Sequence, residues 1–158
     1  MHKILYVTQI LYLMYLILTQ TVLACHESKD LVLLAYTGKS EEVLSIIETG
    51  AELNQLTGDL TPLIAAVKKR RYHLVKLLLE NKAKVDIKND EGLTALMYAA
   101  QLNDTAIVQL LLLFGADPFL TNNNGTSAID IAKITRNKKI INTLVNSRDR
   151  NEIDPYRN

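Results

Sequence analysis

The sequence predicts an all-α solenoid of about four helix-turn-helix repeats that are linked by β-hairpin loops. One motif begins at Thr61, Thr94 and Ser127, so it recurs every 33 residues. A second motif keeps the same phase, and its central alanines are Ala51, Ala83 and Ala116. Apolar stretches of helical character lie between the two motifs, at residues 43–47, 74–79, 107–112 and 140–145. Two motifs that recur in phase indicate stacked units, each of which buries its apolar face against its neighbours.

The first 24 residues differ in composition from the repeats, and we expect them to form a signal peptide. No charged residue stands between Ile4 and Cys25, whereas Lys3 precedes this apolar run. A positive start, an apolar centre and a small residue before the cleavage point are typical of secretory signals. The alternative is an uncleaved membrane anchor, because 22 uncharged residues are long enough to span a bilayer as a helix.

The segment Val22-Leu23-Ala24-Cys25 resembles the lipobox of bacterial lipoproteins. In that family the cysteine thiol is alkylated with a diacylglyceryl group and becomes the first residue after cleavage. Cys25 is the only cysteine of the chain and is therefore the candidate lipidation site. Three outcomes stay open: a lipoprotein held on a membrane surface, a secreted protein with a plain cleaved signal, and a membrane-anchored protein.

The starts of the repeat helices carry residues that suit capping. Thr61 and Thr94 can accept hydrogen bonds from free backbone N–H groups, and Pro62 fits a first helical turn. Ser40 is expected to cap the second helix of the first repeat. Glycines that suit turns with positive φ are Gly50, Gly92, Gly115 and Gly125. We place the repeat domain at residues 25–148, with repeats at about 28–58, 59–91, 92–124 and 125–148.

The last repeat carries a polar helix start at Arg136–Lys139, as a solvent-facing cap at the end of a stack should. Residues 149–158 are polar and include Pro155, so we expect them to form a loose C-terminal tail.

The motif Thr61-Pro62-Leu63-Ile64-Ala65-Ala66, followed by an apolar helix and Gly115-Ala116-Asp117 in its later copy, resembles the ankyrin repeat. The family places His at the fourth position of Thr-Pro-Leu-His, whereas this chain has Ile64, Met97 and Asp130 there. The family's His hydrogen-bond network is therefore expected to be absent. The Gly between the paired helices survives only as Gly38, with Arg70, Asn103 and Arg136 at the equivalent positions.

Composition and motifs give no support for catalysis. The chain has 18 basic and 17 acidic residues, so it lacks the basic excess typical of nucleic-acid binding. One cysteine and three histidines provide no disulfide framework and no Cys/His zinc site. The sequence contains no phosphate-binding glycine loop, and Asp130 is expected to serve as a cap or an inter-repeat hydrogen-bonding group. We therefore expect no enzyme activity, no metal and no cofactor.

The ankyrin resemblance implies that other proteins bind on a concave surface formed by the ends of the first helices and the hairpin tips. The run Lys68-Lys69-Arg70-Arg71 is the densest charge cluster, and it suits either an acidic partner or an ordinary solvated face. In the fourth repeat the equivalent helix end is Ile134 and Thr135. The candidate binding residues are Tyr36, Thr37, Lys68, Lys69, Asp90, Glu91, Gln101, Leu102, Asn123 and Asn124.

These observations together predict an exported, lipid-anchored and monomeric protein of the periplasm or cell envelope that binds a protein partner. Such a module would sequester, shield or stabilise its partner. The alternatives are an uncleaved membrane-anchored scaffold with cytoplasmic repeats and, with least support from the sequence, an enzyme.

Overall fold

A computed structural model describes residues 31–153 of the chain, and it describes side-chain surroundings as far as residue 147. The expected signal segment and Cys25 lie outside the described residues, as do residues 154–158.

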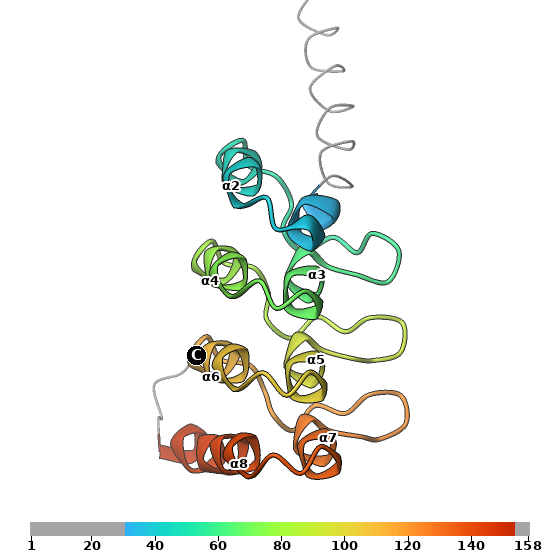
Figure 1. Cartoon of the computed structure of the whole chain (residues 1–158), viewed down its shortest axis with the longest axis vertical. Helices are drawn as coiled ribbons and strands as arrows, with labels where there is room; N and C mark the ends of the chain where they lie inside the picture. The colour runs from blue at the N-terminus through green and yellow to red at the C-terminus, as the bar shows by residue number, and fades with distance from the viewer. Residues whose placement is uncertain (1–30, 154–158) are drawn as a thin grey trace, which may run out of the picture.

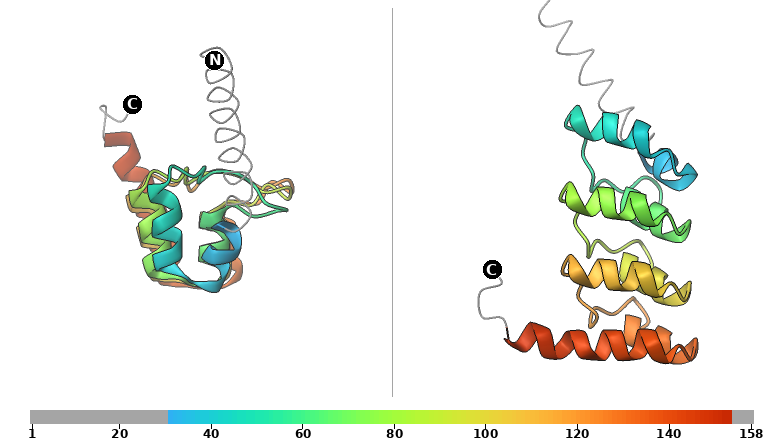
Figure 2. Two further views of the ribbon diagram at one scale, coloured as in Figure 1. Left: turned by 90° about the horizontal axis from the view of Figure 1, so that it is seen from above. Right: turned by 60° about the vertical axis from the view of Figure 1, so that its left-hand side comes forward.

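The described residues form a stack of antiparallel helix pairs (Figure 1). The inner row contains the helical residues 31–37, α3 (Pro62–Lys68), α5 (Ala95–Gln101) and α7 (Ala128–Ile134). The outer row contains α2 (Ser40–Glu48), α4 (Tyr72–Glu80), α6 (Thr105–Leu113) and α8 (Lys138–Ile153). Seen from above in Figure 2, the successive pairs superpose closely. The predicted all-α solenoid of four repeats is confirmed.

The loops between repeats project sideways from the inner row, away from the outer row (Figures 1 and 2). Within residues 31–153 these loops carry only the isolated bridges Thr57–Leu60 and Thr121–Ser127, and no strand. The loops are instead tied to one another along the stack. The backbone N–H of Asn123 donates to the carbonyl of Glu91 over 3.1 Å, and Lys88 Nζ donates to the carbonyl of Thr121 over 2.7 Å.

The inner helices begin with the caps expected from the sequence. Thr61 Oγ1 accepts from the backbone N–H of Ile64 over 3.1 Å, and Thr94 Oγ1 accepts in the same way over 3.4 Å. Ser127 and Asp130 form a reciprocal capping box at the start of α7. Because Thr61 and Thr94 are almost fully buried, their hydroxyls satisfy helix N–H groups that water does not reach.

The cap expected at Ser40 is wrong. Ser40 is the first helical residue of α2, and the capping position falls on Lys39, which makes no side-chain capping bond. The chain turns at Gly38, so α2 begins immediately after the turn and leaves no extended residue for Ser40 to occupy. Lys39 instead forms an exposed ion pair with Glu42 at 2.9 Å.

The turn between paired helices requires a left-handed residue in every repeat. Gly38 adopts φ of 85°, and the equivalent residues Arg70, Asn103 and Arg136 adopt φ of 54°, 61° and 55°. A side chain in this region costs roughly 1–2 kcal/mol relative to the right-handed helix. Asn103 tolerates the conformation best and also accepts a hydrogen bond from Asn137 Nδ2 over 2.6 Å.

The core runs continuously along the stack between the two rows of helices. The inner row supplies small side chains, among them Ala66, Ala99 and Ala132, which are fully buried. The outer row supplies large aliphatic side chains at equivalent positions, and those of Leu74, Leu78, Ile107, Leu111, Ile140 and Leu144 are less than 2% exposed. Small residues facing large ones let adjacent repeats approach closely without leaving voids.

α8 is longer than the other outer helices, at 16 residues against nine in α6. It continues to Ile153, so the backbone of residues 149–153 is helical. The loose tail expected from residue 149 is therefore wrong for residues 149–153, which belong to α8.

Below the hairpin tips, a side-chain oxygen at one position of the repeat accepts a hydrogen bond from a backbone N–H of the next repeat. Asn54 Oδ1 accepts from the backbone N–H of Lys84 over 2.7 Å. At the equivalent position one repeat later, both carboxylate oxygens of Asp86 accept from the N–H of Asp117 at 3.2 Å. Desolvation by burial raises the pKa of Asp86, and this effect outweighs the hydrogen bond from Asp117. The first repeat junction is therefore bridged by a neutral amide and the second by a carboxylate that burial disfavours.

Arg136→Gly is expected to stabilise the protein by about 0.5–1 kcal/mol. Glycine adopts the left-handed conformation without strain, and this gain exceeds the cost of the greater conformational entropy that glycine has in the unfolded chain. Chemical denaturation measures the change. Arg136→Ala keeps the strain and is the control; an equal gain from alanine would contradict the explanation.

Asp86→Asn is expected to raise the melting temperature at pH 7, because the asparagine side-chain oxygen accepts a bond from the same N–H without placing a charge in a half-buried position. The folded-state pKa of Asp86 is raised, so its contribution to stability falls as the pH rises above the unfolded value. The advantage of the variant should therefore be present at pH 7 and disappear near pH 3. Asp90→Asn removes one charge from an exposed position and controls for net charge; an equal gain from it would reject the account.

Candidate protein-binding surface

The candidate binding residues lie in two rows along the stack. The first, here called the helix-end row, lies at the C-terminal ends of the inner helices. It contains Tyr36, Thr37, Lys68, Lys69, Gln101 and Leu102, and it continues to Ile134 and Thr135. The second, the tip row, contains Asp90, Glu91, Asn123 and Asn124 on the projecting loops (Figure 1). In the helix-end row Tyr36 is 39% exposed and Ile134 is 76% exposed. Thr37, Lys68, Lys69 and Gln101 are also exposed, whereas Leu102 is half-buried.

Two residues of the basic cluster contact the first repeat. Lys69 Nζ lies over the ring of Tyr36, 4.0 Å from its centre. The guanidinium of Arg71 donates to the carbonyl of Thr37 over 3.1 Å and packs beside Gly38. A Cβ at Gly38 would lie within 2.6 Å of Arg71 Nε, so the glycine makes room for this contact.

The other two residues of the cluster contact the third repeat. Lys68 Nζ lies over the ring of Tyr98 at 4.9 Å from its centre, and Arg70 donates to the carbonyl of Leu102. The four consecutive basic residues thus alternate between the repeats on either side. An exposed cation–π contact is worth roughly 0.5–1 kcal/mol, so the cluster joins three repeats as well as carrying charge.

The electrostatic surroundings of the two tyrosines differ. The side-chain interaction with Lys69, and then its positive charge, lower the pKa of Tyr36. Burial raises the pKa of Tyr98, and the nearby carboxylates of Asp59 and Glu91 raise it further. Tyr36 is therefore an exposed aromatic group in a positive field, whereas Tyr98 is a neutral, buried support for Lys68.

A hydrogen-bonded chain connects the two rows beneath the surface. The Tyr98 hydroxyl accepts from Asn89 Nδ2 over 3.1 Å, and the same amide donates to Asp59 Oδ2 over 2.7 Å. Asp59 Oδ1 in turn accepts from the backbone N–H of Asp90 over 2.8 Å. Because Asn89 is buried and its amide is fully engaged, this chain holds the tip row in a fixed relation to Lys68.

The tip row is also tied together along the stack. Asn123 Nδ2 donates to the carbonyl of Asp90 over 2.8 Å, while the N–H of Asn124 is held by Asn122 Oδ1 at 3.0 Å. Gly92 is required here, since a Cβ would lie 2.8 Å from the backbone nitrogen of Asn123. The side chains of Asp90, Glu91 and Asn124 remain exposed above this ladder.

The structure places the sequence-predicted residues on these two rows, with two differences. Leu102 is a weaker candidate anchor than expected, because it is half-buried and its carbonyl already accepts from Arg70. Ile134 is the more exposed aliphatic group of the row. Tyr98 and Asn89, which support Lys68, were not singled out; Tyr98 lies three residues before Gln101, a spacing that places both on one helix face.

Side chains that ligate metals do not gather in the part of the chain that the structure describes. Between residues 31 and 153 no group of three or more His, Cys, Asp or Glu side chains is close enough to hold a metal ion. His73 is exposed and packs edge-to-face against Tyr72, with ring centres 5.9 Å apart. In the same part of the chain, no helix has both the length and the apolar character needed to cross a bilayer.

Comparison with protein-family models gives a match to ankyrin repeats in sets of three copies, over residues 31–122 and 82–157. The chain belongs to the ankyrin repeat family. Ankyrin repeats form protein–protein interaction modules. The helix-end row and the tip row both lie on the repeat domain of this chain. In this chain the polar contacts between successive ankyrin repeats are made by Asn54, Asp86 and the basic cluster.

Several curated ankyrin-repeat relatives are similar to this chain. A mouse protein named ankyrin repeat domain-containing protein 63 is 35% identical over 107 residues, which cover 65% of this chain and 26% of the relative. A protein of Oryza sativa subsp. japonica, named as an E3 ubiquitin-protein ligase, is 33% identical over 66% of this chain and 22% of its own length. An ankyrin repeat-containing protein of Treponema pallidum is 32% identical over 61% of this chain and 33% of its own length. The chain thus spans a third or less of these relatives.

Proposed function

We propose that this chain is an exported, lipid-anchored ankyrin-repeat protein that binds a partner protein as a monomer and catalyses no reaction. It would hold its partner to sequester, shield or stabilise it. The observation that carries the binding proposal is the helix-end row, where two lysines lie between the exposed Tyr36 and the exposed Ile134. Tyrosine is among the residue types that most often dominate binding energy at interfaces, so Tyr36 is the first candidate anchor of this row.

The chemistry of the row favours an acidic partner segment. Lys68 and Lys69 are held over tyrosine rings, yet their side chains remain exposed, so each ammonium keeps donors for a carboxylate. Their side chains are already ordered, which reduces the entropy lost on binding. Nucleic acid is disfavoured because the neighbouring tip row carries Asp90 and Glu91, which would repel a phosphate backbone.

The export part of the proposal is supported by the order of residues before the repeats. An uncharged run ends at Val22-Leu23-Ala24-Cys25, and Cys25 is the single thiol available for acylation. The same run also supports the alternative, an uncleaved membrane-anchored scaffold with cytoplasmic repeats. The intact mass of the protein from native membranes distinguishes the two, since cleavage removes residues 1–24.

Cys25→Ser is expected to leave the protein unlipidated, because a hydroxyl does not replace the thiol nucleophile of the thioether bond. The wild type should incorporate labelled fatty acid and fractionate with membranes. The variant should incorporate no fatty acid and should be either soluble or unprocessed, with residues 1–24 retained. Ser28→Ala, three residues further along, is the control and should behave as the wild type. Unchanged mass and membrane fractionation of Cys25→Ser would rule out lipidation and leave the retained anchor.

Lys68→Glu with Lys69→Glu is expected to slow association with an acidic protein partner about tenfold at low salt, since such charges steer encounter. The measurement is binding kinetics at low and high salt with a partner obtained by affinity capture. Lys138→Glu with Lys139→Glu makes the same charge change on α8 and is the control. Because each cation–π contact is worth roughly 0.5–1 kcal/mol, the first variant should also lose about 1–2 kcal/mol of stability.

Lys68→Arg with Lys69→Arg keeps both the charge and the ring contact, so it should retain wild-type association and stability. If association is insensitive to salt and equal in the two reversal variants, the basic cluster is not part of the interface. Binding that persists with normal affinity would then point to the tip row.

A further inference from the structure

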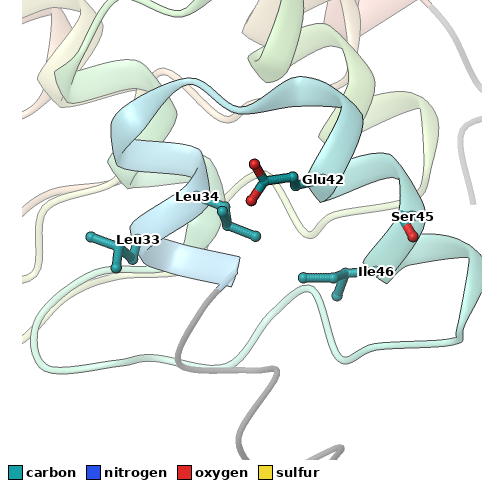
Figure 3. Close-up of a pocket in the computed structure, with 5 residues that line it drawn as sticks. All are labelled: Leu33, Leu34, Glu42, Ser45 and Ile46. Carbon is teal, nitrogen blue, oxygen red and sulfur yellow. The ribbon is translucent and has the colours of Figure 1, made fainter.

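The N-terminal end of the stack carries an apolar cavity of about 420 Å³. It lies between the helical residues 31–37 and α2, and its lining residues are Leu33, Leu34, Glu42, Ser45 and Ile46 (Figure 3). Leu33 is 59% exposed. In Figure 3 the side chains of Leu34, Glu42 and Ile46 point into the space between the two helices.

The positions of Leu34, Glu42 and Ile46 are buried in every later repeat. Ile46 corresponds to Leu78, Leu111 and Leu144, which are all fully buried. Leu34 corresponds to the buried alanines of the inner row, Ala66, Ala99 and Ala132. In repeats two to four these positions lie against the helices of the preceding repeat. The cavity therefore lies on the face on which a preceding helical element would stack.

The charge of the cavity differs from that of its later counterparts. Glu42 stands where repeats two to four place the buried aliphatic residues Leu74, Ile107 and Ile140. Between residues 31 and 56 the chain carries four glutamates and one lysine. Lys39 pairs with Glu42, but both side chains are 54% exposed, and such a pair is worth at most about 1 kcal/mol. A cationic group on an incoming helix could therefore displace it.

These charges decide among the occupants. A second copy in a two-fold arrangement would place the Glu42 carboxylates of both copies at one shared face, which like-charge repulsion disfavours. Cleavage before Cys25, on which this step rests, removes the apolar residues 4–24. The residues then left upstream, at 26–30, include two acids, one lysine and no aliphatic side chain, so their composition does not complement this cavity. A helix with an aliphatic face and flanking lysines or arginines complements both the cavity and Glu42.

We propose that the end face of the first repeat binds an amphipathic, basic helix of a partner protein, which stacks on the solenoid as a preceding repeat would. Aliphatic side chains at i, i+3 and i+4 of that helix fill the cavity beside Leu33 and Ile46, and a lysine or arginine pairs with Glu42. This surface is separate from the helix-end row, so the proposal does not depend on an acidic partner binding there.

The test uses the full chain and a fluorescein-labelled, 18-residue synthetic helix with leucines on one face and lysines beside them. Fluorescence anisotropy should show binding that Glu42→Lys weakens about tenfold. Glu41→Lys makes the same charge change on the adjacent, exposed residue of α2 and should alter affinity by less than about twofold. A peptide with glutamates in place of the lysines should bind Glu42→Lys better than it binds the wild type, which also shows that the variant is folded.

Leu33→Asp, at a position that is already largely exposed, should also abolish binding of the lysine peptide. The proposal is overturned if the lysine peptide does not bind, or if Glu41→Lys and Glu42→Lys weaken it equally. It is also overturned if sedimentation shows wild-type dimers that Leu33→Asp dissociates, since the occupant is then a second copy. Protection of Leu33 and Leu34 from hydroxyl-radical labelling in the isolated monomer would assign the cavity to the chain's own upstream residues.

Discussion

Burial of each helix pair against its neighbours is the constraint on which this structure depends. Its inner helices have seven residues and most of its outer helices have nine, which is too short for stability in isolation. The apolar face of each pair is covered only when the next pair stacks on it, so small side chains are required where the helices approach. Ala66, Ala99 and Ala132 meet this need, while the caps at Thr61 and Thr94 satisfy the buried helix starts.

Close stacking also requires polar links, because backbone groups in the loops must find partners as the repeats approach. This chain lacks histidine at the fourth motif position, where Ile64, Met97 and Asp130 stand. Other residues connect its repeats: the basic cluster, the acceptors Asn54 and Asp86, and the buried Asn89. These groups have different electrostatic properties from a neutral imidazole. Part of the cohesion of the stack therefore depends on charge, in the same residues that are candidates for binding a partner.

The fold could be predicted from the sequence because the phase of two motifs fixes the repeat length, and the repeat length fixes which residues face one another. The caps at Thr61 and Thr94, the glycine turns and the role of Asp130 followed from local chemistry. The contacts of Lys68 and Lys69 could not be predicted, because their tyrosine partners lie in different repeats and on opposite sides of the cluster. The cap predicted at Ser40 was wrong because a shift of one residue decides whether a serine precedes a helix or begins it. The cavity at Glu42 was missed because periodicity alone does not show which face lacks a neighbour.

A stack held by nearest neighbours has no contact that spans its whole length, and this has a mechanical consequence. A pull transmitted through any tether upstream of Leu31 acts first on the repeat that has a neighbour on only one side. Besides its apolar contacts, that repeat is joined to the next by hydrogen bonds of Arg71 and Asn54 and by the contact of Lys69 with the Tyr36 ring. Under load the solenoid therefore peels from its N-terminal end, one helix pair at a time. The long α8 at the far end is the last element to be detached.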